Sequence, residues 1–322
     1  MILVYLVRRI VYGAVTVLGV LLLLFVLFFL VTNPDDIARR ALGEKAPQEA
    51  LEQWKRNHGY AKPRFWNPEA PGDTMIADHF RRMLTFDFGR SDADEVPITR
   101  RLREGLWPSL SLMLPLFLLE LPLAIGIALL VAFLRETYVD RLGVTLCVLG
   151  MSVSVLLYIV GGQYILGKVL RWFPISGFDA RPSVILRFLA LPVAIGVMAG
   201  LGEGVRFYRT VFVEEVGRDH VRTARAKGCG EVRVMTRHVL RNALIPILTQ
   251  VVVAIPFLFT GSLLLESFFG IPGLGALTVD AINANDFATL RTMVFIGSLL
   301  FIVGQILTDL SYAVVDPRVR LE

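Results

Sequence analysis

The apolar run LGVLLLLFVLFFLV, at positions 18–31, limits the fold more than any other feature of this chain. A helix of roughly 20 mainly apolar residues crosses a hydrocarbon core that is about 30 Å thick. Strands of a membrane barrel carry a polar residue at every second position, and this run has none. The run therefore predicts a transmembrane α-helix.

Five more segments have the length and composition of membrane spans. A mean hydropathy of +0.61 with 19% charged residues also lies outside the usual range of a soluble domain. The first span is too long for a signal-peptide core and no clear small-residue cleavage site follows it, so we expect it to be retained. We expect an all-α membrane protein whose six spans cover approximately residues 10–31, 107–134, 143–167, 185–205, 243–265 and 293–315.

The distribution of basic residues predicts the orientation of these spans. Arg8 and Arg9 precede the first span, and basic residues in short loops favour the cytoplasmic side. Six crossings then place both termini in the cytoplasm, together with the nine Lys and Arg residues of the loop at about 206–241. The segment 32–105 would be external. It carries thirteen basic and thirteen acidic residues and is too long for the charge rule to apply.

The external segment contains two short amphipathic patterns, PQEALEQWKRN and DTMIADHFRRMLTF. Both predict short helices, and Asp73 is a plausible N-cap of the second. We therefore divide the chain into residues 1–31 (N-terminus and first span), 32–105 (a small external appendage) and 106–322 (a core of five helices).

One stretch superficially resembles a phosphate-binding loop. Gly162 is followed by four residues and then by Gly167 and Lys168, but Val169 stands where a Ser or Thr must ligate magnesium. The four histidines show no metal-binding spacing. We expect no nucleotide, cofactor or metal on this chain.

Small and charged residues inside the spans have structural and functional interpretations. Gly196, Gly200 and Gly204 recur every four residues, which favours close packing of two helices. Glu120 lies mid-span, where an ionised carboxylate needs water or a partner. It either faces an aqueous path or is buried against another polar group, and the sequence favours neither.

The loop at 206–241 is rich in arginine. The preference of basic residues for cytoplasmic loops, together with contact with lipid headgroups, would explain the positive charge of this loop. They would not explain Ala224, Ala226 and Gly228, small residues on a predicted short helix that suit insertion into a groove of a partner protein. We therefore favour docking.

The motif RTARAKG followed by VMTRHVLRNALIP resembles the cytoplasmic coupling loop of binding-protein-dependent ABC importer permeases, in particular the dipeptide and oligopeptide permease family. In the general pattern of that family a Glu-Ala-Ala triplet precedes a glycine. Here Arg222-Thr223-Ala224 replaces the triplet and Gly228 is kept, as in the peptide branch. Similar segments occur in family order over nearly the whole chain, namely HGYAKP, FDFGRS, FGIPGLG, NDFATL and YAVVDPRVR.

The resemblance implies a type I importer permease in a bacterial inner membrane, where this chain supplies half of a translocation path. Its implied partners are a second homologous permease, two cytoplasmic ATPase subunits that bind ATP and magnesium, an external solute-binding protein and membrane lipid, but no nucleic acid. The family works by alternating access driven by ATP.

The resemblance also assigns roles to residues. Small residues would allow close approach of an ATPase, and Arg222, Arg225 and Lys227 would meet acidic or backbone acceptors. The predicted coupling residues are Asp219, Arg222, Thr223, Ala224, Arg225, Ala226, Lys227 and Gly228. For the translocation path we predict Glu120 and Glu266.

Peptides are the expected solute, with nickel, glutathione and oligosaccharides as alternatives from the same family. A membrane enzyme would need catalytic residues near Glu120, Glu203, Glu266 or Asp309, but these acids lack a nucleophile, metal triad or cofactor signature. A self-sufficient channel or secondary transporter would not need the coupling loop. We therefore expect a transport subunit rather than an enzyme.

Overall fold

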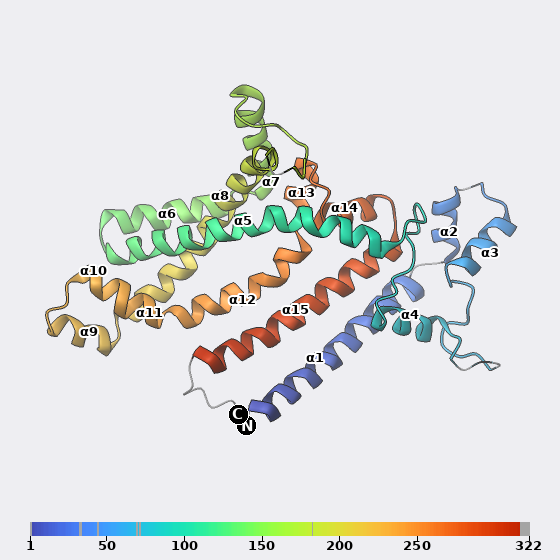
Figure 1. The fold of residues 1–322 in the computed structure, drawn as a ribbon, viewed down its shortest axis with the longest axis horizontal. Coiled ribbons are helices and arrows are strands. Elements are labelled where there is room, and N and C mark those ends of the chain that lie inside the picture. The colour runs from blue at the N-terminus through green and yellow to red at the C-terminus, as the bar shows by residue number, and fades with distance from the viewer. Residues whose placement is uncertain are drawn as a thin grey trace.

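The computed structural model describes residues 2–31, 34–43, 45–68, 70, 72–181 and 183–315, and these form helices without any extended strand. Figure 1 shows long helices running side by side, with short helices at both ends of the bundle. The long elements are α1 (Ile2–Phe25, continued by the π-helix Val26–Val31), α5 (Ile98–Phe133), α6 (Tyr138–Ser152), α8 (Ile185–Val216), α12 (Leu244–Thr260) and α15 (Phe287–Val315). The shorter elements are α2 (Pro34–Leu42), α3 (Gln48–Asn57), α4 (Met75–Leu84), α7 (Val155–Gly162, continued by the π-helix Gln163–Val169), α9 (Asp219–Ala226), α10 (Glu231–Arg233), the π-helix Val234–Val239, α11 (Leu240–Asn242), α13 (Leu263–Phe269) and α14 (Leu274–Asn283).

Five segments of the described chain are long and apolar enough to cross a membrane, and a bent pair of helices gives a sixth if the pair forms one span. The expected all-α membrane fold is therefore confirmed. The five are Val7–Val31, Ile98–Phe133, Ile185–Val216, Leu244–Phe269 and Phe287–Leu310.

The third predicted span, 143–167, is not one continuous helix. Its residues belong to Tyr138–Ser152 and Val155–Val169, which meet at an angle of 86°. Val153 is extended at the break, and the Ser154 hydroxyl accepts a hydrogen bond from the Leu156 N–H. Because this hydroxyl caps the first turn of α7, it stabilises a helix start inside an apolar run that hydropathy cannot divide.

The glycine series of α8 lies against α5, as the sequence predicts. A Cβ atom added at Gly196 would lie 2.3 Å from Leu116 Cδ1, far inside van der Waals contact. The same addition at Gly204 would bring it to 3.0 Å from Ala124 Cβ. The facing residues of α5, Leu116, Glu120 and Ala124, also recur every four positions. One face of α8 therefore meets one face of α5, and larger side chains in place of the glycines would separate the two helices.

The helices α1 and α15 run side by side in Figure 1. An ion pair joins the N-terminal part of α1 to the C-terminal part of α15. Arg9 Nε lies 3.0 Å from Asp309 Oδ2. An isolated charge near a membrane is costly, and this pairing offsets much of that cost. Asp309 thus has a structural partner within the chain.

The appendage, residues 32–105, packs on α1 by means of its helix α4. Met75, His79 and Met83, spaced four residues apart, are buried on one face, and His79 Nε2 lies 3.1 Å from the backbone oxygen of Leu21. The predicted cap is wrong by one residue. Thr74 accepts the capping bond from the Ala77 N–H, whereas Asp73 pairs with Lys62 at 2.8 Å.

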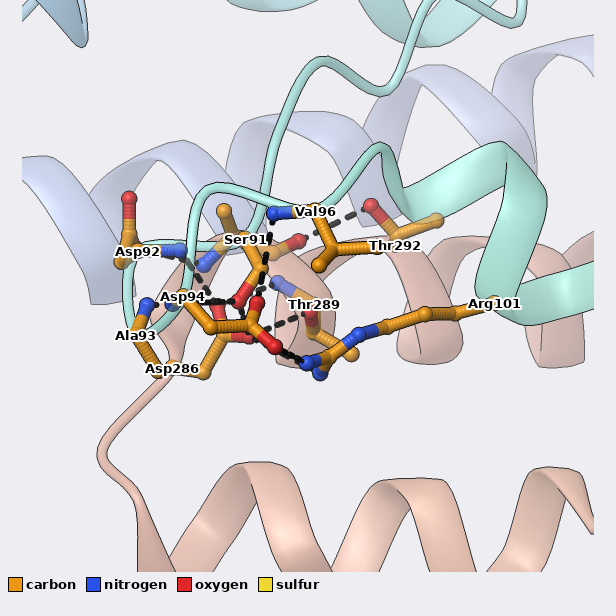
Figure 2. Close-up of polar contacts among 10 residues, drawn as sticks. Ser91, Asp92, Ala93, Asp94, Val96, Arg101, Asp286, Thr289 and Thr292 are labelled. Carbon is orange, nitrogen blue, oxygen red and sulfur yellow. Dashed lines mark hydrogen bonds and ion pairs between the residues drawn. The ribbon is translucent and has the colours of Figure 1, made fainter. Parts of the chain in front are cut away.

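A polar cluster ties the appendage to the first turn of α15 (Figure 2). Asp286 accepts hydrogen bonds from Ser91 Oγ at 2.6 Å, from the Asp92 N–H at 3.0 Å and from the Thr289 N–H at 3.0 Å. Asp92 in turn accepts from the Ala288 N–H at 2.8 Å. Two carboxylates from distant parts of the chain therefore cap one helix, because its first N–H groups have no partner within the helix.

We expect Gly196→Ala to destabilise the protein by about 1–3 kcal/mol, because the new methyl group overpacks the contact with Leu116. Gly126→Ala is the matched control on α5, since no other atom lies within 4 Å of a Cβ there. Thermal unfolding of the two purified variants measures the difference. Equal midpoints would contradict the packing argument.

Stability should also depend on His79. Burial, and to a smaller degree the charge of Arg291, lowers the pKa of His79 from 6.5 to about 4. Between these values the unfolded chain binds a proton that the folded chain does not, so the free energy of unfolding falls as pH drops from about 6.5 towards 4. The contribution of His79 is at most about 3 kcal/mol.

Unfolding of the wild type and of His79→Gln at pH 7 and pH 5 isolates this contribution, since other titrating groups cancel in the comparison. The wild type should lose more stability than the variant. An identical loss in both would show that His79 does not titrate in this range.

Candidate coupling site and central cavity

The predicted coupling residues lie on α9 and the two residues after it, Lys227 and Gly228, and α9 stands at one end of the long helices (Figure 1). One face of α9 is inside the chain's own core, with Val221 0% and Ala224 5% exposed. They pack in a cluster that includes Phe212 from α8 and Val239 from the π-helix Val234–Val239. The small side chain of Ala224 therefore allows close packing within this chain.

A buried acid fixes the start of α9. Glu215, in the last turn of α8, has its Oε2 atom 3.0 Å from Arg218 Nε and its Oε1 atom 3.2 Å from His220 Nε2. His220 Nε2 also lies 2.9 Å from Asn242 Nδ2 of α11. These residues hold α9 between α8 and α11. The sequence pattern alone does not single out these residues, although an acid within an arginine-rich loop is a usable signal.

The end of α9 is closed by an ion pair and a glycine. Arg225 donates to both carboxylate oxygens of Glu231, at 2.8 and 3.0 Å, so this predicted coupling residue has an ion-pair partner within the chain while its side chain stays 35% exposed. Gly228 has φ +79°, the left-handed conformation that favours glycine, and its N–H donates to the Arg225 oxygen at 2.9 Å. Its backbone conformation thus explains why a glycine stands here.

The outer face of α9 remains accessible. Side-chain exposure reaches 97% at Asp219 and 74% at Arg222, which lie 3.6 Å apart as a loose pair. Val232, on α10, is 71% exposed and adds an apolar residue that the sequence pattern does not single out. The predicted coupling residues on this open face are Asp219, Arg222, Thr223, Ala226, Lys227 and Gly228.

Glu120 lines a cavity of about 230 Å³ between α5, α8 and α12. Gly200 makes room for its carboxylate, because a Cβ atom there would lie 2.3 Å from Glu120 Oε1. A second carboxylate, Glu203, shares the cavity, and Tyr208 and Gln250 add polar groups. No lysine or arginine is among the described lining residues, so an ion pair does not enclose Glu120 here.

Glu266 has different surroundings. Its side chain is fully buried and accepts hydrogen bonds from Ser109 Oγ at 2.8 Å, the Ser262 N–H at 3.1 Å and the Ala276 N–H at 3.0 Å. Ser109 also accepts from the Leu274 N–H at 2.8 Å. The carboxylate thus joins α5, α13 and the first turn of α14. It does not reach the cavity, so its predicted path role has no support in this conformation.

The remaining sequence motifs also have structural explanations. The run from Gly162 to Lys168 is helical, so the strand-to-loop context of a phosphate site is missing. Within the part of the chain that the structure describes, no group of three or more His, Cys, Asp or Glu side chains could hold a metal ion.

We expect Glu215→Gln to loosen α9, because the amide loses its charge-assisted bonds to Arg218 and His220. Both partners are partly exposed, so a loss of about 1 kcal/mol is expected, which is roughly a fivefold increase in local opening. Amide hydrogen exchange of residues 219–226 measures it. Glu214→Gln serves as control, because it removes only an exposed pair with Arg218 and no contact to His220, and equal exchange in both variants would argue against the anchor.

Comparisons with known proteins identify the family. Residues 124–321 match the model of binding-protein-dependent transport system inner membrane components, and residues 2–67 match the model of the N-terminal part of such membrane components. The first match alone covers more than half of the chain.

Full-length relatives agree with both models. A putative peptide transport system permease protein of Brucella abortus (strain 2308) is 32% identical over 309 residues, 94% of this chain and 96% of the relative. Glutathione transport system permease proteins of Salmonella typhimurium and Pectobacterium atrosepticum are each 32% identical, over 93% and 98% of this chain and 94% and 98% of the relatives. The chain belongs to the family of inner-membrane permease subunits of binding-protein-dependent ABC importers.

Proposed function

We propose that this permease imports peptides or peptide-like solutes, as one half of a path that it shares with a second, homologous permease. The relatives named for peptide and glutathione transport, which match the chain almost end to end, carry this proposal. Glutathione is itself a peptide-like solute and is the second candidate. No observation on this chain favours nickel or an oligosaccharide.

The cavity supports a solute of this class. A peptide carries an ammonium group, and the two carboxylates of Glu120 and Glu203 complement a cation in a space with few other charges. The aromatic side chains of Phe117 and Phe207 line the same cavity and can contact apolar side chains or a cation. We therefore assign the passage of solute to the space between α5, α8 and α12.

Coupling would use the outer face of α9. Two ATPase subunits would bind ATP and magnesium, and their closure would move α9 together with α8, to which Glu215 anchors it. An external solute-binding protein would deliver the solute on the opposite side. This arrangement requires both termini of the chain to lie on the side of the ATPases.

Purification of the intact complex with its binding protein, followed by mass spectrometry of the retained solute, tests the proposal. A peptide or glutathione is the expected ligand, and it should stimulate ATP hydrolysis in reconstituted membranes. A retained sugar or metal would overturn the solute class. Active transport by this chain without any ATPase would overturn the importer mechanism for it.

We predict that Ala226→Trp disrupts coupling, because Ala226 is exposed on the docking face and its replacement leaves this chain's core untouched. Solute-stimulated hydrolysis should fall by about tenfold or more, equivalent to about 1.4 kcal/mol. Arg222→Ala should change it by about fivefold at most, since exposed ion pairs contribute only about 0–1 kcal/mol.

Ala226→Ser is the matched control, because it keeps a small side chain at the same position. Membrane insertion and assembly are checked for each variant. Normal stimulated hydrolysis by Ala226→Trp in an assembled complex would exclude this face as the ATPase contact.

We predict that Glu120→Gln lowers solute uptake by about tenfold or more while assembly stays normal, because an interaction with a charged group contributes about 1.5–3 kcal/mol. A cysteine at position 120 should react with a water-soluble thiol reagent. Leu116→Cys, one turn away against Gly196, should not react. Loss of assembly without any reactivity at position 120 would show that Glu120 is a buried structural group.

A further inference from the structure

The external appendage exposes four large apolar side chains at the two ends of α4. Phe65 is 57% and Trp66 is 70% exposed near its start, and Leu84 is 50% and Phe86 is 53% exposed at its end. The 63–66 strip is fixed beside the start of α4, because the Met75 N–H donates to the Pro63 oxygen at 2.9 Å. A water-facing module rarely exposes so many large apolar groups together, so this patch needs a partner.

Contacts with two membrane helices place both ends of the patch below the external surface of the bundle. The Phe65 ring lies 5.7 Å from Phe25, and the Phe86 ring lies 6.2 Å from Phe295. Phe25 is six residues inside the end of the span Val7–Val31, and Phe295 is eight residues inside the start of the span Phe287–Leu310. At 1.5 Å per helical residue these depths are roughly 9 and 12 Å.

These depths correspond to the boundary between headgroups and acyl chains. The headgroup layer occupies about 5–8 Å on each side of the hydrocarbon core, so positions roughly 9 and 12 Å deep lie just past its inner edge, in the outermost part of the acyl chains. Apolar side chains near the two contacted rings are also exposed on the spans themselves. Leu22 on α1 is 50% exposed and Val294 on α15 is 45% exposed, each within three residues of the ring that the appendage contacts.

The conformation of Phe86 supports a specific use of its side chain. Phe86 directly follows Thr85, the C-cap of α4, and has φ +57° at a position where glycine is the usual residue; its N–H donates to the Met83 oxygen at 3.2 Å. A phenylalanine is strained in this conformation, whereas a glycine would not be. In this conformation the Phe86 ring is half exposed and also contacts the ring of Phe295.

The chemistry of the neighbouring residues matches a phospholipid surface. Arg64 precedes the Phe65–Trp66 pair, and Arg81 lies one turn before Leu84 and is also exposed. Tryptophan and phenylalanine at the level of the headgroups, with arginine beside them, form the usual contact of an interfacial segment with lipid. From these observations we infer that Phe65, Trp66, Leu84 and Phe86 insert into the external leaflet and fix the appendage to the membrane surface.

Quenching of tryptophan fluorescence by brominated lipid tests this inference in the full permease complex, reconstituted in nanodiscs of phosphatidylcholine and phosphatidylglycerol. The difference between the wild type and Trp66→Phe isolates the signal of Trp66. The fluorescence of Trp66 should fall several-fold when the phosphatidylcholine carries bromine near the headgroup end of its acyl chains. The matched control is Trp54→Phe, since Trp54 belongs to the same appendage but is only 7% exposed, and its signal should not change.

A second position keeps the test independent of the folding of one variant. Phe86→Trp in the Trp66→Phe background should restore a signal that brominated lipid quenches. Failure of the lipid to quench either position overturns the inference. Quenching by acrylamide instead would mean that the patch faces water, and protection from both quenchers would mean that a partner protein covers it.

Discussion

The close approach of α5 and α8 is the contact on which the rest of the molecule depends. In lipid, apolar side chains gain little from leaving their solvent, so helices associate through fit and through satisfied polar groups. Gly196, Gly200 and Gly204 remove the side chains that would hold the two backbones apart. The same series leaves the space into which Glu120 projects, so one row of glycines both packs the core and shapes its cavity.

Polar side chains then fix the shorter elements to this pair and to α15. Asp286 holds the appendage at the start of α15, Glu266 holds α13 and α14 on α5, and Glu215 holds α9 at the end of α8. Each is a buried carboxylate that accepts hydrogen bonds from a helix terminus or from a neighbouring side chain. Because a buried acid without partners is costly, these contacts specify one geometry more strictly than apolar packing does.

Long helices that pack through glycines, with short elements fixed to them by buried carboxylates, suit a subunit that transmits movement. The element that would contact an ATPase is joined to α8, and α8 also lines the cavity, so displacement of α9 reaches Glu203 and Tyr208 through one continuous helix. At the end of the long helices away from α9, the appendage is tied to α1 and α15. The inferred lipid contact would stabilise these two peripheral helices while α5, α8 and α12 change their relative positions.

The sequence by itself determined the membrane class, five of the spans, the glycine packing face and the family, because these depend on composition and spacing along single helices. The tertiary structure decided which side chains point inwards. Ala224 and Arg225 are adjacent on a helix that the sequence presents as a docking surface, yet one is in the core and the other pairs with Glu231. Likewise Glu120 and Glu266 are both acids within apolar segments, and only their neighbours from other helices make one line a cavity and the other join three helices. Such differences arise from groups far apart in the chain, so local periodicity could not predict them.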